Sequence, residues 1–171
     1  LSFVEKEDVM EVNEGMLKRL FKEVLDVDIQ TPFKRLTYKE AMEHYGSDKP
    51  DTRFGLKLKD IGDLVANSEF KVFTETRANG GIIRAINAEG LGAKLSRKDI
   101  DSLGEFVKTY RAKGLAWINI TSEGVKSPIA KFLKDYELNG IIDRVGGKLG
   151  DIIFIVSDKP KVVFDSLGQL R

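Results

Sequence analysis

The stretch FKRLTYKEAMEHYGSDKPDTRF, residues 33–54, carries the features that divide this chain into its parts. Thr37 followed by Glu40 is the pattern of a capping box, and Gly46 lies where the last turn of a short helix would end. The loop from Ser47 to Arg53, which contains a proline, then terminates this element. Beyond the stretch the spacing of apolar residues changes, so we expect a second structural region to begin there.

Before this stretch, apolar residues recur at helical spacing. They predict an amphipathic helix from Glu5 to about Leu25, and its apolar stripe consists of Val9, Val12, Met16, Leu20 and Val24. Exposed stripes of this kind promote association. We therefore expect the 5–25 helix to pack against a second copy of the chain or to become mobile.

The remaining residues predict alternating short elements. We expect a short helix at 60–65, strands at 69–77 and 82–88 joined as a hairpin through Asn79-Gly80-Gly81, a helix capped by Ser96, a strand at 115–121, a helix opened by Ser127 and Pro128 and continued at 135–145, a strand at 151–156, and a last helix capped by Ser157 or Asp158. This order predicts an α+β fold of two layers. Its sheet would be mainly antiparallel and four-stranded, with helices on one face, and the long amphipathic helix would precede it.

Composition limits the possible functions. The 171 residues are 42% apolar and 32% charged, with no cysteine and no apolar run of membrane-spanning length, which is typical of a cytoplasmic globular protein. The 28 basic residues are balanced by 27 acidic ones. Strong nonspecific attraction to nucleic acid is therefore not expected, and any RNA contact must be local.

Catalytic constellations are mostly missing from the sequence. His44 is the single histidine, so histidine-based metal clusters are excluded, and its position near a helix end favours a structural role. The glycine-rich runs at 90–94 and 146–150 lack the spacing of a phosphate-binding loop and are interpreted as turns. We expect no catalytic residue, no metal site and no cofactor within the chain itself.

The candidate binding site is the loop between the two regions. Its polar side chains are those of Ser47, Asp48, Lys49, Asp51 and Arg53. The carboxylates offer oxygens to magnesium and the cations suit phosphate or a carboxylate. The alternative is a turn that satisfies its own charges and fixes the junction between two domains.

The stretch that opens this section also resembles bacterial aspartyl-tRNA synthetase, a class II enzyme. The matching residues are Arg35-Leu36-Thr37-Tyr38 with Glu40-Ala41, followed by Tyr45-Gly46-Ser47-Asp48-Lys49-Pro50-Asp51 and Arg53. Segments 113–118, 126–133 and 150–154 look like the insertion of that family, the GAD domain. The resemblance implies a GAD/DCoH-like sheet, with residues 1–53 a remnant of the catalytic domain and 54–171 the insertion.

The resemblance also implies a function for a parent protein. Such a parent would join aspartate to tRNA(Asp) with ATP and magnesium, as a cytoplasmic homodimer. Because the chain opens with Leu1-Ser2-Phe3-Val4, we expect a segment excised between the second and third signature motifs of the class. Asp143-Arg144 lacks the context of the third motif, so the chain itself is expected to be inactive.

Two alternatives remain open for the chain. One is a stand-alone tRNA-binding module, like the GAD domain in the B subunit of tRNA-dependent amidotransferase. The other is an interdomain scaffold without a ligand, which suits the near-neutral charge. Residues 33–53 favour the synthetase, because they resemble the border of its catalytic domain.

Overall fold

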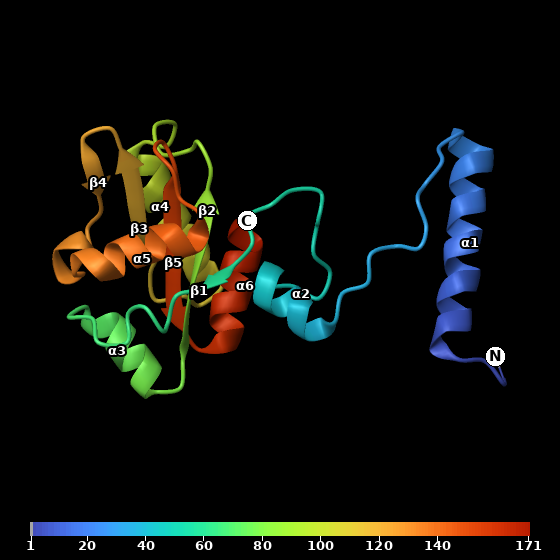
Figure 1. Ribbon diagram of the computed structural model, residues 1–171, viewed down its shortest axis with the longest axis horizontal. Coiled ribbons are helices and arrows are strands. Elements are labelled where there is room, and N and C mark those ends of the chain that lie inside the picture. The colour runs from blue at the N-terminus through green and yellow to red at the C-terminus, as the bar shows by residue number, and fades with distance from the viewer. Residues whose placement is uncertain (1) are drawn as a thin grey trace. The chain divides into compact units, whose positions relative to one another are not determined.

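The computed structural model describes residues 2–171, which form two compact units, one ending at Leu36 and one spanning Thr37–Arg171. Figure 1 labels their helices and strands. The elements are α1 (Lys6–Leu25), α2 (Tyr38–Tyr45), β1 (Lys59–Asp60), α3 (Lys71–Ala78), β2 (Ile82–Ala88), α4 (Arg97–Thr109), β3 (Ala116–Thr121), β4 (Gly124–Lys126), a short 3-10 helix (Ala130–Phe132), α5 (Asp135–Val145), β5 (Ile152–Asp158) and α6 (Pro160–Leu170).

The first unit consists of α1 and the segment that follows it. The predicted amphipathic helix is confirmed, and it begins after a capping box formed by Glu5 and Asp8. Glu14 is the one buried residue among residues 2–36. Its Oε1 accepts a hydrogen bond from the backbone N–H of Phe33 at 3.0 Å and another from the guanidinium of Arg35. These bonds tie the following segment to α1.

Four of the five residues in the apolar stripe of α1 are exposed, and Val9 is half-buried. Val12, Met16, Leu20 and Val24 are 72%, 57%, 52% and 68% exposed. A helix that leaves such a stripe in water gains little from burial, so α1 depends on its caps and on charged pairs four residues apart along its surface.

The second unit is built around a five-stranded sheet in the order β1-β2-β5-β3-β4, in which every described pair is antiparallel. Central strand β5 pairs with β2 along seven residues, from Ile82 opposite Asp158 to Ala88 opposite Ile152. On its other side it pairs with β3, from Ala116 to Asn119. The α+β class predicted from the sequence is confirmed.

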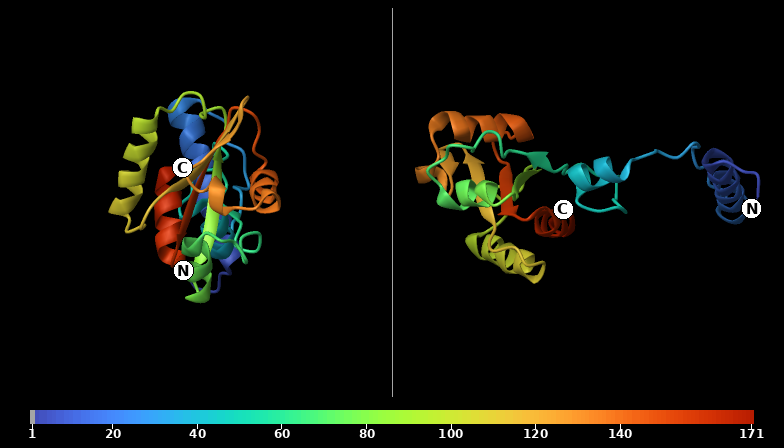
Figure 2. Two further views of the ribbon diagram at one scale, coloured as in Figure 1. Left: turned by 90° about the vertical axis from the view of Figure 1, so that its left-hand side faces the viewer. Right: turned by 90° about the horizontal axis from the view of Figure 1, so that it is seen from below.

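Helices cover both faces of the sheet, which corrects the prediction of helices on one face (Figure 2). Along β5, Ile152, Phe154 and Val156 belong to the apolar core on the side of α4 and α6. Ile153 and Ile155 belong to the core on the side of α3 and α5. Because successive side chains of a strand point to opposite faces, this unbroken apolar run needs cover on both sides.

The prediction of a strand at 69–77 was wrong, because most of that region forms α3. Phe73 is its buried residue, and the packing of Phe73 in the core on the α3 side overrides the alternation of residues 69–77. Asn79-Gly80-Gly81 ends this helix instead of turning a hairpin, since Gly81 N–H donates to the carbonyl of Thr76 at 2.8 Å. Gly80 has φ +71°, a conformation that both a helix end and a tight hairpin require.

The helix predicted at 60–65 is also absent from the described chain. Asp60 instead pairs with Arg84 of β2, and its Oδ1 accepts from Gly62 N–H at 2.9 Å, which turns the chain. The sheet has five strands rather than the predicted four. The additional ones, β1 and β4, are two and three residues long, too short for the period of a strand to show in the sequence.

Two helix starts differ from the prediction. Ser127 Oγ donates to the carbonyl of Trp117 at 2.7 Å and accepts from Ile129 N–H at 3.2 Å, so it shapes a turn. The short 3-10 helix follows this turn, and α5 begins separately at Asp135, which confirms the helix predicted at 135–145. The last helix has Lys159 at its N-cap, with Pro160 in its first turn, rather than a cap by Ser157 or Asp158. Proline fixes the backbone angle that a first turn needs.

Candidate functional site

The site begins with α2, which positions the junction loop against α6. Thr37 Oγ1 accepts from Glu40 N–H at 3.1 Å, and the Glu40 carboxylate accepts from Thr37 N–H at 2.9 Å, so the predicted capping box is confirmed. Gly46 ends the helix with φ +68°. A Cβ built there would lie 2.4 Å from the carbonyl oxygen of Phe164 and 2.9 Å from Cα of Gly168, both in α6. The two backbones thus meet where neither residue has a side chain.

The chain stays attached to this unit on both sides of the loop. Tyr45, at the end of α2, is buried. After the loop, Leu58 N–H donates to the carbonyl of His44 at 2.8 Å, and the Leu58 side chain enters the core on the α4 and α6 side. The loop is therefore held at two fixed ends.

Inside the loop, Asp51 and Arg53 neutralise each other. The Asp51 carboxylate accepts from the backbone N–H and from Nε of Arg53, each at 3.0 Å, and from its Nη2. This is a bidentate pair, the geometry in which carboxylate and guanidinium bind most strongly. Both charges are used within the loop.

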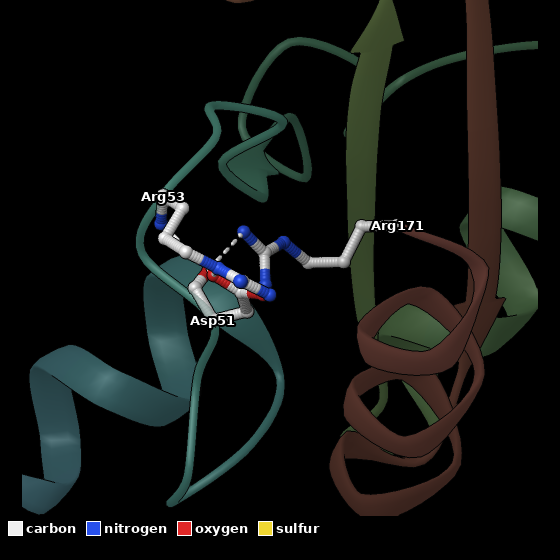
Figure 3. Close-up of polar contacts among 3 residues, drawn as sticks. All are labelled: Asp51, Arg53 and Arg171. Atoms are coloured by element: carbon white, nitrogen blue, oxygen red, sulfur yellow. Dashed lines mark hydrogen bonds and ion pairs between the residues drawn. The ribbon is translucent and has the colours of Figure 1, made fainter. Parts of the chain in front are cut away.

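Arg171 reaches the loop from the end of α6 (Figure 3). Its guanidinium donates to the carbonyls of Asp51 and Gly55 at 3.0 Å each and to that of Leu56 at 3.3 Å. It also lies over the rings of Tyr45 and Phe54, 4.9 and 4.6 Å from their centroids. One side chain thus joins α2, the junction loop and α6.

Hydrogen bonds from the Arg53 side chain, and then from its backbone, lower the pKa of Asp51 to about 2. The carboxylate is therefore ionised at neutral pH. Because the folded-state pKa is depressed, the stabilisation is present above the ordinary value near 4 and is lost as pH falls toward 2. Burial lowers the pKa of Arg171, an effect that the charges of Tyr45 and Asp51 oppose.

The other predicted site residues are placed differently. Ser47 Oγ accepts from the backbone N–H of Lys49 at 3.1 Å, which makes it part of the turn. Asp48 and Lys49 are exposed, and in residues 2–171 their side chains form no hydrogen bond or ion pair. The loop thus offers one carboxylate and one ammonium to solvent. This arrangement supports the interpretation of a self-satisfied turn, and a substrate-binding role stays a prediction.

Other candidates from the sequence have structural partners. The glycine-rich runs meet each other, since Gly92 N–H donates to the carbonyl of Gly150 at 2.8 Å. Asp151 accepts from Gly90 N–H and Lys148 N–H, so the two runs are turns that one carboxylate holds.

The Asp143-Arg144 pair is likewise structural. Arg144 forms a bidentate ion pair with Asp63, at 2.8 and 3.0 Å, and donates to the carbonyl of Asp60. Across the described part of the chain, no three His, Cys, Asp or Glu side chains are placed to hold a metal ion. Within the same residues, no helix is long and apolar enough to cross a membrane.

Sequence reasoning missed Arg171 and Gly168. Arg171 contacts residues up to 120 positions away, which no local pattern can indicate. Gly168 carried a weak signal, because glycine inside an apolar helix pattern often marks close approach of another backbone.

The comparisons with known proteins identify a family and several relatives for this chain. The chain belongs to the GAD domain family, which matches residues 73–167 and thus more than half of the sequence. It is 60% identical over its whole length to the Aspartate--tRNA ligase of Clostridium perfringens strain ATCC 13124 and 57% identical to that of Clostridium acetobutylicum. It is 54% identical to the Aspartate--tRNA(Asp/Asn) ligase of Caldanaerobacter subterraneus subsp. tengcongensis.

These matches confirm the resemblance inferred from the sequence. The chain spans 28% of the length of the Clostridium perfringens protein and 29% of each of the other two. Each match covers all of this chain, including α1, α2 and the junction loop, which lie outside the residues matched by the GAD family.

Proposed function

We propose that this chain belongs to an enzyme that attaches aspartate to tRNA(Asp) with ATP and magnesium, and that its residues 54–171 serve there as a noncatalytic insertion. The observation that carries the proposal is the 60% identity over all 171 residues with an Aspartate--tRNA ligase. The proposed enzyme is cytoplasmic and homodimeric. Within it, residues 1–53 belong to the catalytic domain and residues 54–171 to the insertion.

The role proposed for the junction is mechanical. Gly46 and Arg171 hold α2 and the junction loop against α6, and the Asp51–Arg53 pair fixes the loop itself. A displacement of α6 is therefore proposed to move α2 with it. Asp48 and Lys49 project from this fixed loop and are the residues proposed to contact a substrate. No step of aminoacylation is assigned to them.

A stand-alone tRNA-binding module related to the amidotransferase B subunit is the alternative. Such a module would account for residues 73–167, which the GAD family matches. It would not account for the likeness to ligases through residues 1–72. The ligase is therefore the preferred proposal.

The chain itself is expected to bind tRNA(Asp) weakly, because its basic and acidic residues balance. Titration of tRNA(Asp) at about 50 and 200 mM salt would show weak binding that disappears at the higher concentration, as contacts to phosphate do. Tight, saturable binding at both concentrations would contradict the expectation and support a binding module. If no tRNA bound at either salt concentration, the interdomain scaffold would be the one remaining role.

The α1 stripe is expected to drive self-association of the isolated chain. Sedimentation equilibrium should show dimers or larger species, and Met16→Glu with Leu20→Glu should shift them to monomer, because charge on an apolar contact prevents its burial. Lys18→Glu, at an exposed position of the same helix, is the control and should change little. If the unsubstituted chain were monomeric at high concentration, this expectation would be contradicted.

A further inference from the structure

A hollow on the α3 side of the sheet has an apolar half and a polar half. The apolar half has a volume of about 300 Å³, and Phe70 and Leu115 are among the residues that line it. The polar half has a volume of about 530 Å³. Val72, Lys113 and Ser157 line both halves, so the two halves adjoin. Their sizes fall within the usual range for small-molecule sites.

The polar half contains charges without partners. Lys113, Lys159 and Glu75 line it, and in the described part of the chain their side chains form no hydrogen bond or ion pair. Asp158 also lines it, with Oδ1 accepting from Lys159 N–H at 2.8 Å and Oδ2 buried without a partner. The lining of the polar half therefore includes two exposed cations, the exposed carboxylate of Glu75 and the half-buried carboxylate of Asp158.

This combination is selective for a particular ligand chemistry. Two lysines suit a phosphate, but a site for a simple anion would not include two carboxylates, which repel it. Carboxylates commonly accept hydrogen bonds from ribose hydroxyls. An apolar slot suits the face of a nucleobase. A ligand with a base, a ribose and a phosphate would contact the apolar slot, the carboxylates and the lysines together.

We propose that this hollow binds a single ribonucleotide, with the base in the apolar half, the phosphate at Lys113 and Lys159, and the ribose hydroxyls at Glu75 and Asp158. None of these residues belongs to the junction loop. The inference stands apart from the proposed ligase, because it depends only on the lining of the hollow. The ribonucleotide is either free or the unpaired end of an RNA strand.

Adenosine 5′-monophosphate titrated into the isotope-labelled full chain tests the proposal by NMR. Backbone signals of residues 113–116 and 157–159 should shift saturably. Binding should weaken about tenfold in the double variant Lys113→Ala, Lys159→Ala, which removes both phosphate contacts. The control Lys94→Ala, Lys98→Ala removes the same charge from exposed positions outside the hollow and should leave the affinity within about twofold.

Three comparisons decide the chemistry and the source of the ligand. The 2′,3′-dideoxy analogue and inorganic phosphate should each bind at least about tenfold more weakly than the ribonucleotide, because each lacks contacts that the full ligand makes. A short unpaired RNA that binds more tightly than the mononucleotide identifies a strand end, and the reverse identifies a free nucleotide. Equal affinity for phosphate alone, or no saturable shift at residues 113–116 and 157–159, would overturn the proposal.

Discussion

Replacing Gly168 by alanine is expected to lower the free energy of unfolding by about 1–3 kcal/mol, although alanine favours helices by about 1 kcal/mol. The added Cβ would lie 2.7 Å from the carbonyl oxygen of Gly46 and 3.0 Å from that of Tyr45. Both contacts are with backbone, which cannot rotate away. The α2–α6 contact must therefore open, and chemical denaturation measures the loss.

Substitutions at two other glycines separate the effect of a steric clash from the effects of helix propensity and backbone strain. Gly104 lies inside α4 with no atom within 4 Å of a built Cβ, so Gly104→Ala should stabilise the chain by up to about 1 kcal/mol. Gly80 has φ +71° and equally open surroundings, so Gly80→Ala measures the backbone strain alone, about 1–2 kcal/mol. If Gly168→Ala stabilised the chain as much as Gly104→Ala, the close approach of α2 to α6 would be contradicted.

Replacing Arg171 by alanine should lower the free energy of unfolding by about 2–3 kcal/mol. The change removes three hydrogen bonds to backbone carbonyls and two ring contacts. Each charged hydrogen bond contributes roughly 1.5 kcal/mol or more and each ring contact about 0.5–1 kcal/mol, but part of this is recovered when water replaces the guanidinium. Hydrogen exchange should also quicken in residues 47–56, because the loop loses its attachment to α6.

Lys161→Ala is the matched control on the same helix. Lys161 forms an exposed ion pair with Asp165, and such a pair contributes little, so its loss should cost about 0.5 kcal/mol or less. Arg171→Lys keeps the charge but not the planar fork, and should recover only part of the stability. Unchanged exchange in residues 47–56 of Arg171→Ala would show that the Asp51–Arg53 pair alone fixes the loop.

Elements with complete local signals were predicted correctly. The α2 helix has a capping box and a terminal glycine within ten residues, and α4 follows the N-cap Ser96, whose Oγ accepts from Asp99 N–H. These signals act between neighbours, so tertiary contacts do not alter them. The central strand was also found, because its apolar run is long.

Predictions failed where tertiary contacts decided the structure. Residues 69–77 alternate well enough to suggest a strand, but Phe73 packs in the core on the α3 side and the chain forms a helix. The helices were predicted on one face of the sheet instead of two, because a sequence does not show on which side of a sheet each connecting helix lies. The junction loop was recognised as polar, but its main partner is Arg171, far along the chain.

This chain contains a GAD domain, and we propose that it belongs to an aspartate--tRNA ligase without performing the chemistry of that enzyme. Aspartate-dependent exchange of pyrophosphate into ATP measures the first chemical step directly. The purified chain should show no exchange above a protein-free blank, whereas the whole Aspartate--tRNA ligase of Clostridium perfringens, assayed in parallel, should show it. Exchange by the purified chain that depends on aspartate would contradict the account.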